Sequence, residues 1–205
     1  MHYVSFSPID TQHIVSRSST RILWWNINGY QVPPKYSGSH IAFSLDHTQF
    51  AVCNGKVVTV YQVSDSRIIG AKSCVAEEEP EHCCFSPDGK LIAAATYGTA
   101  YVWNITSPNP HLIETFPCHT QKITSLVFSS PSSLISASDD ELVRFWKIGI
   151  LSTDLAMADS GSTPFISPSI MSVSLQARAG IAISSDKDGV VKSWDISTGH
   201  CKTSF

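Results

Sequence analysis

One spacing recurs five times along this chain: a corner residue, four times Phe and once Leu, is followed by Trp or Tyr after 18 or 19 residues. The pairs are Phe6 with Trp25, Phe43 with Tyr61, Phe85 with Trp103, Phe128 with Trp146, and Leu175 with Trp194. The distance between successive terminal aromatics varies more widely, from 36 to 48 residues. A constant inner spacing with a variable outer one indicates a repeated supersecondary unit joined by loops of different length. Repeats of about 40 to 45 residues with four short strands each are typical of propeller blades.

Each unit reads as several short strands separated by turns. Val, Ile, Phe, Tyr, Trp and Thr dominate the strands, and Gly, Pro, Asn, Asp and Ser interrupt them. No stretch of more than ten residues has a helical period. The sequence therefore predicts an all-β fold, a β-propeller or an open propeller arc with five four-stranded blades, in a single region over residues 1–205. The predicted blades cover approximately residues 1–36, 37–75, 80–118, 119–169 and 170–205.

Charge and composition argue against several classes of ligand and location. The net charge is −3 and no basic stripe occurs, so nucleic acid is not expected as a partner. No apolar run approaches the ~20 residues needed to span a bilayer, and the start of the chain does not resemble a secretory signal. The six cysteines lack Cys-x-x-Cys pairing, as expected of small buried hydrophobic residues in a reducing compartment. These features predict a soluble cytoplasmic protein without membrane contact.

The fourth and fifth units carry a specific motif. Residues 136–146, Ser-Ala-Ser-Asp-Asp-Glu-Leu-Val-Arg-Phe-Trp, resemble the Ser-Gly-Ser-x-Asp-x-Thr-Val-Arg-Leu-Trp pattern of WD repeats. The fifth unit repeats the match with Ser184, Asp188 and the dipeptide Trp194-Asp195. The chain is therefore similar to the WD-repeat β-propeller family over essentially its whole length. In style, its degenerate, Ser-rich repeats most resemble the C-terminal WD-repeat regions of fungal NACHT-type signalling proteins related to vegetative-incompatibility factors. That resemblance implies a ligand-sensing role, with a nucleotide-binding switch outside this chain.

The resemblance also implies a structural hydrogen-bond network in these units. In the fourth unit Asp140 would accept from His119, His119 would meet the Ser136 hydroxyl, and Ser136 would accept from the Trp146 indole. In the fifth unit the corresponding residues are Ser184, Asp188 and Trp194. The same residue types could form a hydrolase triad, but a triad needs an exposed nucleophile and an oxyanion hole. Because no Gly-x-Ser-x-Gly elbow is present, we predict a structural network and no catalytic residues.

The other units depart from this pattern, and no cofactor or metal site is expected in any of them. In the third unit, Ala93 and Tyr97 stand where the family has Ser and Asp. His82, Cys83 and Cys84 could suggest a metal centre, but adjacent strand residues point to opposite faces and zinc-type Cys spacing is absent. No phosphate-binding Gly-rich loop occurs either.

The turns between the second and third strands form the candidate binding rim, because WD propellers gather these turns on one face. The predicted rim residues are Ser18, Asn54, Thr96, Asp139 and Lys187. Their variation fits a recognition surface on a constant frame, although turns also vary where nothing constrains them. The Ser-rich insertion at residues 149–169 is the next candidate. The predicted function is a non-catalytic scaffold or ligand-sensing module that binds a protein or peptide, with further blades of a longer chain or self-association as additional partners. The alternative is the propeller portion of a larger signalling NTPase or enzyme.

Overall fold

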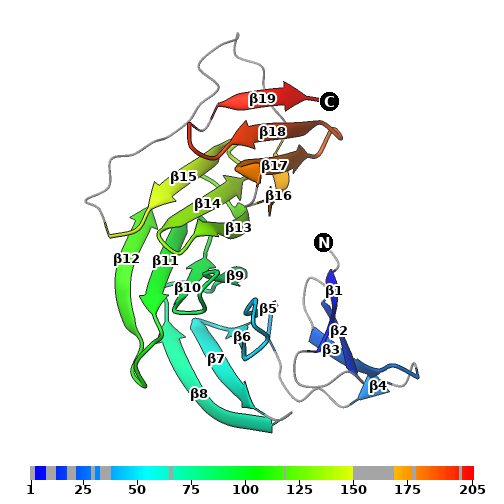
Figure 1. Ribbon diagram of the computed structural model, residues 1–205, viewed down its shortest axis with the longest axis vertical. Coiled ribbons are helices and arrows are strands. Elements are labelled where there is room, and N and C mark those ends of the chain that lie inside the picture. The colour runs from blue at the N-terminus through cyan, green and yellow to red at the C-terminus, as the bar shows by residue number, and fades with distance from the viewer. Residues whose placement is uncertain are drawn as a thin grey trace.

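The computed structural model describes residues 3–7, 13–17, 22–28, 31–32, 38–64, 67–117, 119–149, 169–176, 179–198 and 200–205. The described elements are all β-strands, and they form five antiparallel sheets. The sheets follow one another along the chain in an open arc, from the blue first sheet to the red fifth sheet (Figure 1). The predicted all-β propeller arc of five blades is thereby confirmed.

Each sheet is built from strands that are consecutive in the chain, as the meander of a propeller blade requires. The first sheet contains β1 (Tyr3–Phe6), β2 (His13–Arg17), β3 (Ile22–Asn26) and β4 (Gln31–Val32). The second contains β5 (His40–Phe43), β6 (Gln49–Asn54), β7 (Val57–Ser64) and β8 (Arg67–Val75). The third contains β9 (His82–Phe85), β10 (Leu91–Ala95), β11 (Thr99–Asn104) and β12 (His111–Pro117). The last two contain β13 (Ile123–Ser130), β14 (Ser133–Ser138) and β15 (Val143–Lys147), then β16 (Ile170–Gln176), β17 (Ile181–Asp186), β18 (Val191–Asp195) and β19 (Cys201–Ser204).

The fourth sheet differs from the expectation of four strands, since three of its strands lie in the described residues. Most of the predicted insertion follows β15 and lies outside the described part of the chain, which resumes at Ser169. The other four sheets each have four described strands.

In the second and third sheets, a serine and an aspartate hold the turn between the first and second strands. In the third sheet the Ser86 hydroxyl donates to Asp88 Oδ1 at 2.7 Å and accepts from the Leu91 amide at 2.9 Å. Ser44 makes the same two bonds in the second sheet, at 2.7 and 2.9 Å, and its hydrogen bond lowers the pKa of Asp46. The Ser-Pro-Asp-Gly sequence that predicts a tight turn therefore forms one, with Gly89 at φ 67°.

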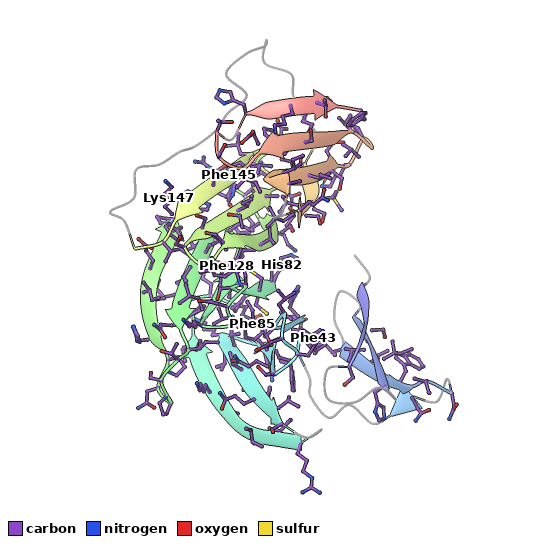
Figure 2. The ribbon with its side chains drawn as sticks, viewed as in Figure 1. Phe43, His82, Phe85, Phe128, Phe145 and Lys147 are labelled. Carbon is purple, nitrogen blue, oxygen red and sulfur yellow. The ribbon has the colours of Figure 1, made fainter. Side chains whose placement is uncertain are left out.

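The hydrophobic core consists of four separate clusters, each between two consecutive sheets. We call the side of a sheet that is turned toward the preceding sheet its leading face, and the opposite side its trailing face. The residues that pair with the terminal aromatics lie on leading faces, and in the last four sheets they are 0% exposed: Phe50, Ile92, Leu134 and Ala182. The corner aromatics Phe43, Phe85 and Phe128 of three successive sheets are labelled in Figure 2. Within the described residues no cluster joins the first sheet to the fifth.

Candidate functional site

Four side chains form a buried hydrogen-bond network in the fourth sheet. His119 Nδ1 lies 2.8 Å from Asp140 Oδ2, and His119 Nε2 lies 2.7 Å from the Ser136 hydroxyl. The Trp146 indole N–H donates to the same hydroxyl at 3.0 Å. Asp140 also accepts from the backbone amides of Thr120 and Leu142 at 3.1 Å each. The network therefore connects the segment before the sheet, its second strand, its turn and its third strand.

The burial of His119 and Ser136 determines whether this network could act in catalysis. Burial lowers the pKa of His119 more than the hydrogen bond and charge of Asp140 raise it, so the pKa lies below its usual 6.5. The lowered pKa favours the neutral imidazole; with the proton on Nδ1, the ring donates to Asp140 and its Nε2 accepts from Ser136. Ser136 is 0% exposed, donates to His119 and accepts from Trp146. Because a nucleophile must be reachable by substrate, this geometry supports fold stability and not hydrolysis.

The fifth sheet contains part of this network. The Trp194 indole donates to the Ser184 hydroxyl at 2.8 Å, as Trp25 does to Ser16 in the first sheet at 2.6 Å. The turn, however, is ordered by Asp186, whose Oδ1 accepts from the backbone amides of Asp188 and Val190. Asp188, the predicted network residue, is exposed in that turn.

The strand register corrects the positions expected in the third sheet. Ile92 pairs with Trp103 there, as Leu134 pairs with Trp146 in the fourth sheet. Counting from these pairs, Ala94 occupies the place of Ser136, and Gly98 the place of Asp140. The residues predicted for those places, Ala93 and Tyr97, are each one position too early.

The same register changes part of the predicted binding rim. Thr96 is 1% exposed, so it cannot contact a partner at the surface, and the residue equivalent to Asp139 is the 63% exposed Tyr97. Asn54 is exposed at the turn of the second sheet. Ser18 lies outside the described residues. Asp139 and Lys187 occupy equivalent positions in the fourth and fifth sheets, and the structure brings these two predicted residues together.

A cavity of about 490 Å³ lies where the second to fifth sheets meet at this rim. Asp139 and Lys187 line it, together with residues that precede or begin the first strands: Ser39, Glu79, Pro80, Glu81, His82, Lys122, Thr124 and Met171. The residues directly before β5, β9 and β13 are Ser39, Glu81 and Lys122, so these cavity residues come from one repeated position. Sequence reasoning missed them, although their constant place before the first strand is a signal that the repeat alignment contains.

Each junction between sheets at the cavity has a polar cross-link. The Ser39 hydroxyl donates to the Pro80 carbonyl at 3.2 Å between the second and third sheets. Glu81 and Lys122 form an ion pair between the third and fourth sheets. Between the fourth and fifth sheets, Lys187 Nζ lies 3.5 Å from Asp139 Oδ1. Lys187 also donates to the hydroxyl of Ser169, which directly precedes the fifth sheet, at 3.0 Å. Next to these cross-links, the rings of His82 and His40 pack edge to face, with their centroids 5.1 Å apart.

The charges at the cavity are accessible and can change partners. The side chains of Lys122 and Glu81 are 41% and 50% exposed, and those of Lys187 and Asp139 are 54% and 24% exposed. Exposed ion pairs contribute only about 0–1 kcal/mol each, so an arriving charged group can displace one member at small cost. The arrangement suits recognition of a polar or charged segment of a partner on a fixed frame.

The described residues contain no group of three or more His, Cys, Asp or Glu side chains placed to hold a metal ion. Among them there is also no helix of the length and hydrophobicity that a membrane crossing would need.

Comparison with known proteins places two segments of the chain in one family. Residues 73–104 and 110–147 match the family described as "WD domain, G-beta repeat". The chain is similar to "Target of rapamycin complex subunit wat1" of Schizosaccharomyces pombe, with 24% identity over 83% of this chain and 49% of that protein. It is similar to "COMPASS component SWD3" of Saccharomyces cerevisiae, with 27% identity over 77% of this chain and 48% of that protein. Human "WD repeat-containing protein 37" matches with 26% identity over 49% of the chain and 20% of that protein. The chain thus spans about half the length of the first two relatives and a fifth of the third.

Proposed function

We propose that this chain, two segments of which match the WD-repeat family, is a non-catalytic scaffold that binds a protein or peptide at the cavity where its second to fifth sheets meet. The observation that carries this proposal is the cavity itself. Residues of four sheets line it, and three of these sheets supply exposed charges of both signs at equivalent positions of the repeated frame. The names of two relatives, a complex subunit and a complex component, agree with a role in assembly.

The charged side chains at the cavity indicate which kind of partner segment it would bind. Glu81, Asp139, Lys122 and Lys187 offer alternating acceptors and donors across three sheets. A partner segment with charges of both signs, spaced to exchange with these two ion pairs, fits this surface. Tyr97, exposed at the neighbouring turn, adds an amphipathic contact of the type enriched at interfaces.

The test exchanges the charges of one ion pair. The double variant Asp139→Lys with Lys187→Asp keeps an ion pair between the fourth and fifth sheets. The positive charge now comes from the fourth sheet and the negative charge from the fifth. A partner is first identified by pull-down with the recombinant chain, and its affinity is then measured for both proteins. We expect a loss of affinity of about tenfold or more, equivalent to about 1.4 kcal/mol, with an unchanged melting temperature.

Lys147→Glu is the matched control, because Lys147 is an exposed lysine that does not line the cavity. Figure 2 shows Lys147 on the outer side of the arc and His82 on its inner side. Equal affinity of the exchanged variant and the wild type would place the partner site elsewhere.

A second candidate is that these repeats sense a ligand within a larger signalling protein, such as an NTPase of the fungal NACHT type. The degenerate repeats favour it, because within the described residues the full His–Ser–Asp network occurs in the fourth sheet, while the other four sheets form without it. Buried free thiols such as Cys53 and Cys74 favour a reducing, cytoplasmic location. Under this candidate the partner retained in the pull-down is a small ligand or a segment of the same polypeptide.

A further inference from the structure

The turn between the first and second strands of the fourth sheet lacks the carboxylate that the second and third sheets have there. Asp46 and Asp88 each lie four positions before the residue that pairs with the terminal aromatic. The Oδ1 atom of each aspartate accepts from the backbone amide two residues further on, at 3.1 and 3.2 Å. The same count from Leu134 in the fourth sheet gives Ser130. A serine therefore occupies the place of an aspartate.

Ser130 makes the hydrogen bond of the missing aspartate but has no charge. Its hydroxyl oxygen accepts from the amide of Ser132 at 3.2 Å, again two residues further on. Within the described residues the Ser130 hydroxyl has only the Ser132 hydroxyl, 3.5 Å away, as a side-chain neighbour at hydrogen-bond distance. In the third sheet, by contrast, the Ser86 hydroxyl donates to Asp88 at 2.7 Å. The Ser130 hydroxyl is thus held loosely, at a position where related sheets have a negative charge.

The sequence and exposure of this turn fit an enzyme that modifies serine. Ser130 is followed by Pro131, and one large class of protein kinases requires proline directly after the serine that it phosphorylates. Ser130 is partly exposed, and Pro131 and Ser132 are exposed. Two other serines that precede proline, Ser7 and Ser86, are 7% and 1% exposed, so a kinase cannot reach them in the folded protein.

A lysine lies in register with Ser130. Ser130 pairs with Ser133, and Ser133 pairs with Lys147, so the three side chains form one row on the same face of the sheet. Neighbouring strands lie about 4.8 Å apart, so about 10 Å separates the Cα atoms of Ser130 and Lys147. A lysine and a phosphoserine together span that distance. Lys147 is exposed on the outer side of the arc (Figure 2), and its ammonium group has no hydrogen bond or ion pair within the described residues.

We propose that Ser130 is a phosphorylation site of a proline-directed protein kinase and that Lys147 binds the phosphate. The Ser130 hydroxyl oxygen attacks the γ-phosphorus of a nucleoside triphosphate. The new O–P bond replaces the bond from that phosphorus to the β,γ-bridging oxygen, the nucleoside diphosphate leaves, and a base of the kinase takes up the hydroxyl proton. The phosphate carries a charge of about −1.5 to −2 at pH 7. It offers anionic acceptors to the Ser132 amide and to Lys147, as the carboxylate of Asp88 does to its own turn.

The modified turn lies at the opposite end of the sheet from the cavity. β14 begins at Ser133, directly after this turn, and ends at Ser138, directly before the cavity residue Asp139. A phosphate on Ser130 therefore adds charge to the face of the arc that is remote from the cavity, whether or not a partner binds there.

Phosphorylation is tested on the folded full chain with proline-directed kinases and ATP, and mass spectrometry maps the modified residues. We expect phosphate on Ser130, and its loss in Ser130→Ala. Ser107→Ala is the matched control, because Ser107 also precedes proline but donates to the Asn109 carbonyl at 2.6 Å; this variant should keep the phosphate on Ser130. A folded chain without phosphate on Ser130 overturns the proposal, and so does modification of Ser130 only after unfolding.

A second measurement tests the contact with Lys147. Phosphorus NMR of the phosphorylated chain gives the second pKa of the phosphate, which is about 6 in phosphoserine. The positive charge of Lys147 favours the dianion, so Lys147→Gln should raise this pKa by about 0.2–0.7, as expected for an exposed ion pair. Lys56→Gln is the control, because Lys56 is exposed in a turn of the second sheet and should leave the pKa unchanged. Equal phosphate pKa values in the wild type and Lys147→Gln would overturn the assignment of Lys147.

Discussion

At the scale of single residues, hydrogen-bonded groups in this protein stabilise the blades where burial excludes water. His119 is the clearest case, since both ring nitrogens have partners inside the fourth sheet. The residue types Ser, His and Asp are also those of a hydrolase. Burial of the hydroxyl, which the sequence alone does not give, distinguishes the two roles.

The lowered pKa of His119 predicts a pH dependence of folding. In the unfolded chain the imidazole takes up a proton near pH 6.5, while burial lowers its pKa in the folded protein, so that the folded state takes up the proton at a lower pH. The unfolded state therefore binds more protons as the pH falls below about 6.5, and this contribution to stability is complete above that pH and is lost below it. We expect the urea midpoint to fall more between pH 7.5 and pH 5.5 for the wild type than for His119→Gln. Equal decreases in the two proteins would show that His119 does not cause the effect.

At the scale of elements, the repeat spacing predicted the strands well but placed some turns one residue off. The terminal aromatic pairs with a residue 12 positions earlier in the fourth and fifth sheets. In the first three sheets the interval is 11, because the hairpin is one residue shorter. If the longer interval is applied to the third sheet, counting back from Trp103 puts Ala93 at the place of Ser136 and Thr96 at the place of Asp139. The observed register puts Ala94 and Tyr97 at those places.

The cavity was less accessible to prediction than the strands. Lys122 and Glu81 meet because consecutive sheets place equivalent residues side by side. The periodicity of residues within one sheet does not predict the distance between side chains of two different sheets. The pairing of Asp139 with Lys187 was likewise not evident, although both residues were expected on the rim.

The turn between first and second strands gives a prediction about backbone conformation. His47 occupies the position of Gly89, with φ 58° and 67° respectively, a region that costs a residue with a Cβ roughly 1 kcal/mol or more. His47→Gly should therefore stabilise the protein or leave it unchanged. Gly89→His should destabilise it by about 1 kcal/mol or more, since its Cβ would also meet Gln49 Nε2 at 3.3 Å. Thermal unfolding of both variants measures the effects, and equal changes in melting temperature would contradict the assigned turn.

At the scale of the whole molecule, stability is shared between neighbours along the arc. Within the described residues, the second, third and fourth sheets each contribute to two core clusters, whereas the first and fifth each contribute to one. Repeat proteins with this organisation are stabilised by each repeat and by its contacts with adjacent repeats.

Hydrogen exchange should reveal this distribution directly. We expect the amides of β10 and β14 to exchange most slowly, because these strands lie between two clusters. Amides of β2 and β17 should exchange faster, because their sheets have one covered face. Mass spectrometry of peptides from all four strands, at low protein concentration, checks the order. Uniform protection along the chain would indicate a single cooperative unit instead.

The separation of the core into four clusters also has a mechanical consequence. The cross-links described at the cavity each join two adjacent sheets, and none of these three links connects the first sheet to the fifth. A small rotation in the same direction at each junction would add up from one end to the other. We therefore expect a ligand that draws the inner rim together to move the two outermost sheets by more than it changes any single junction.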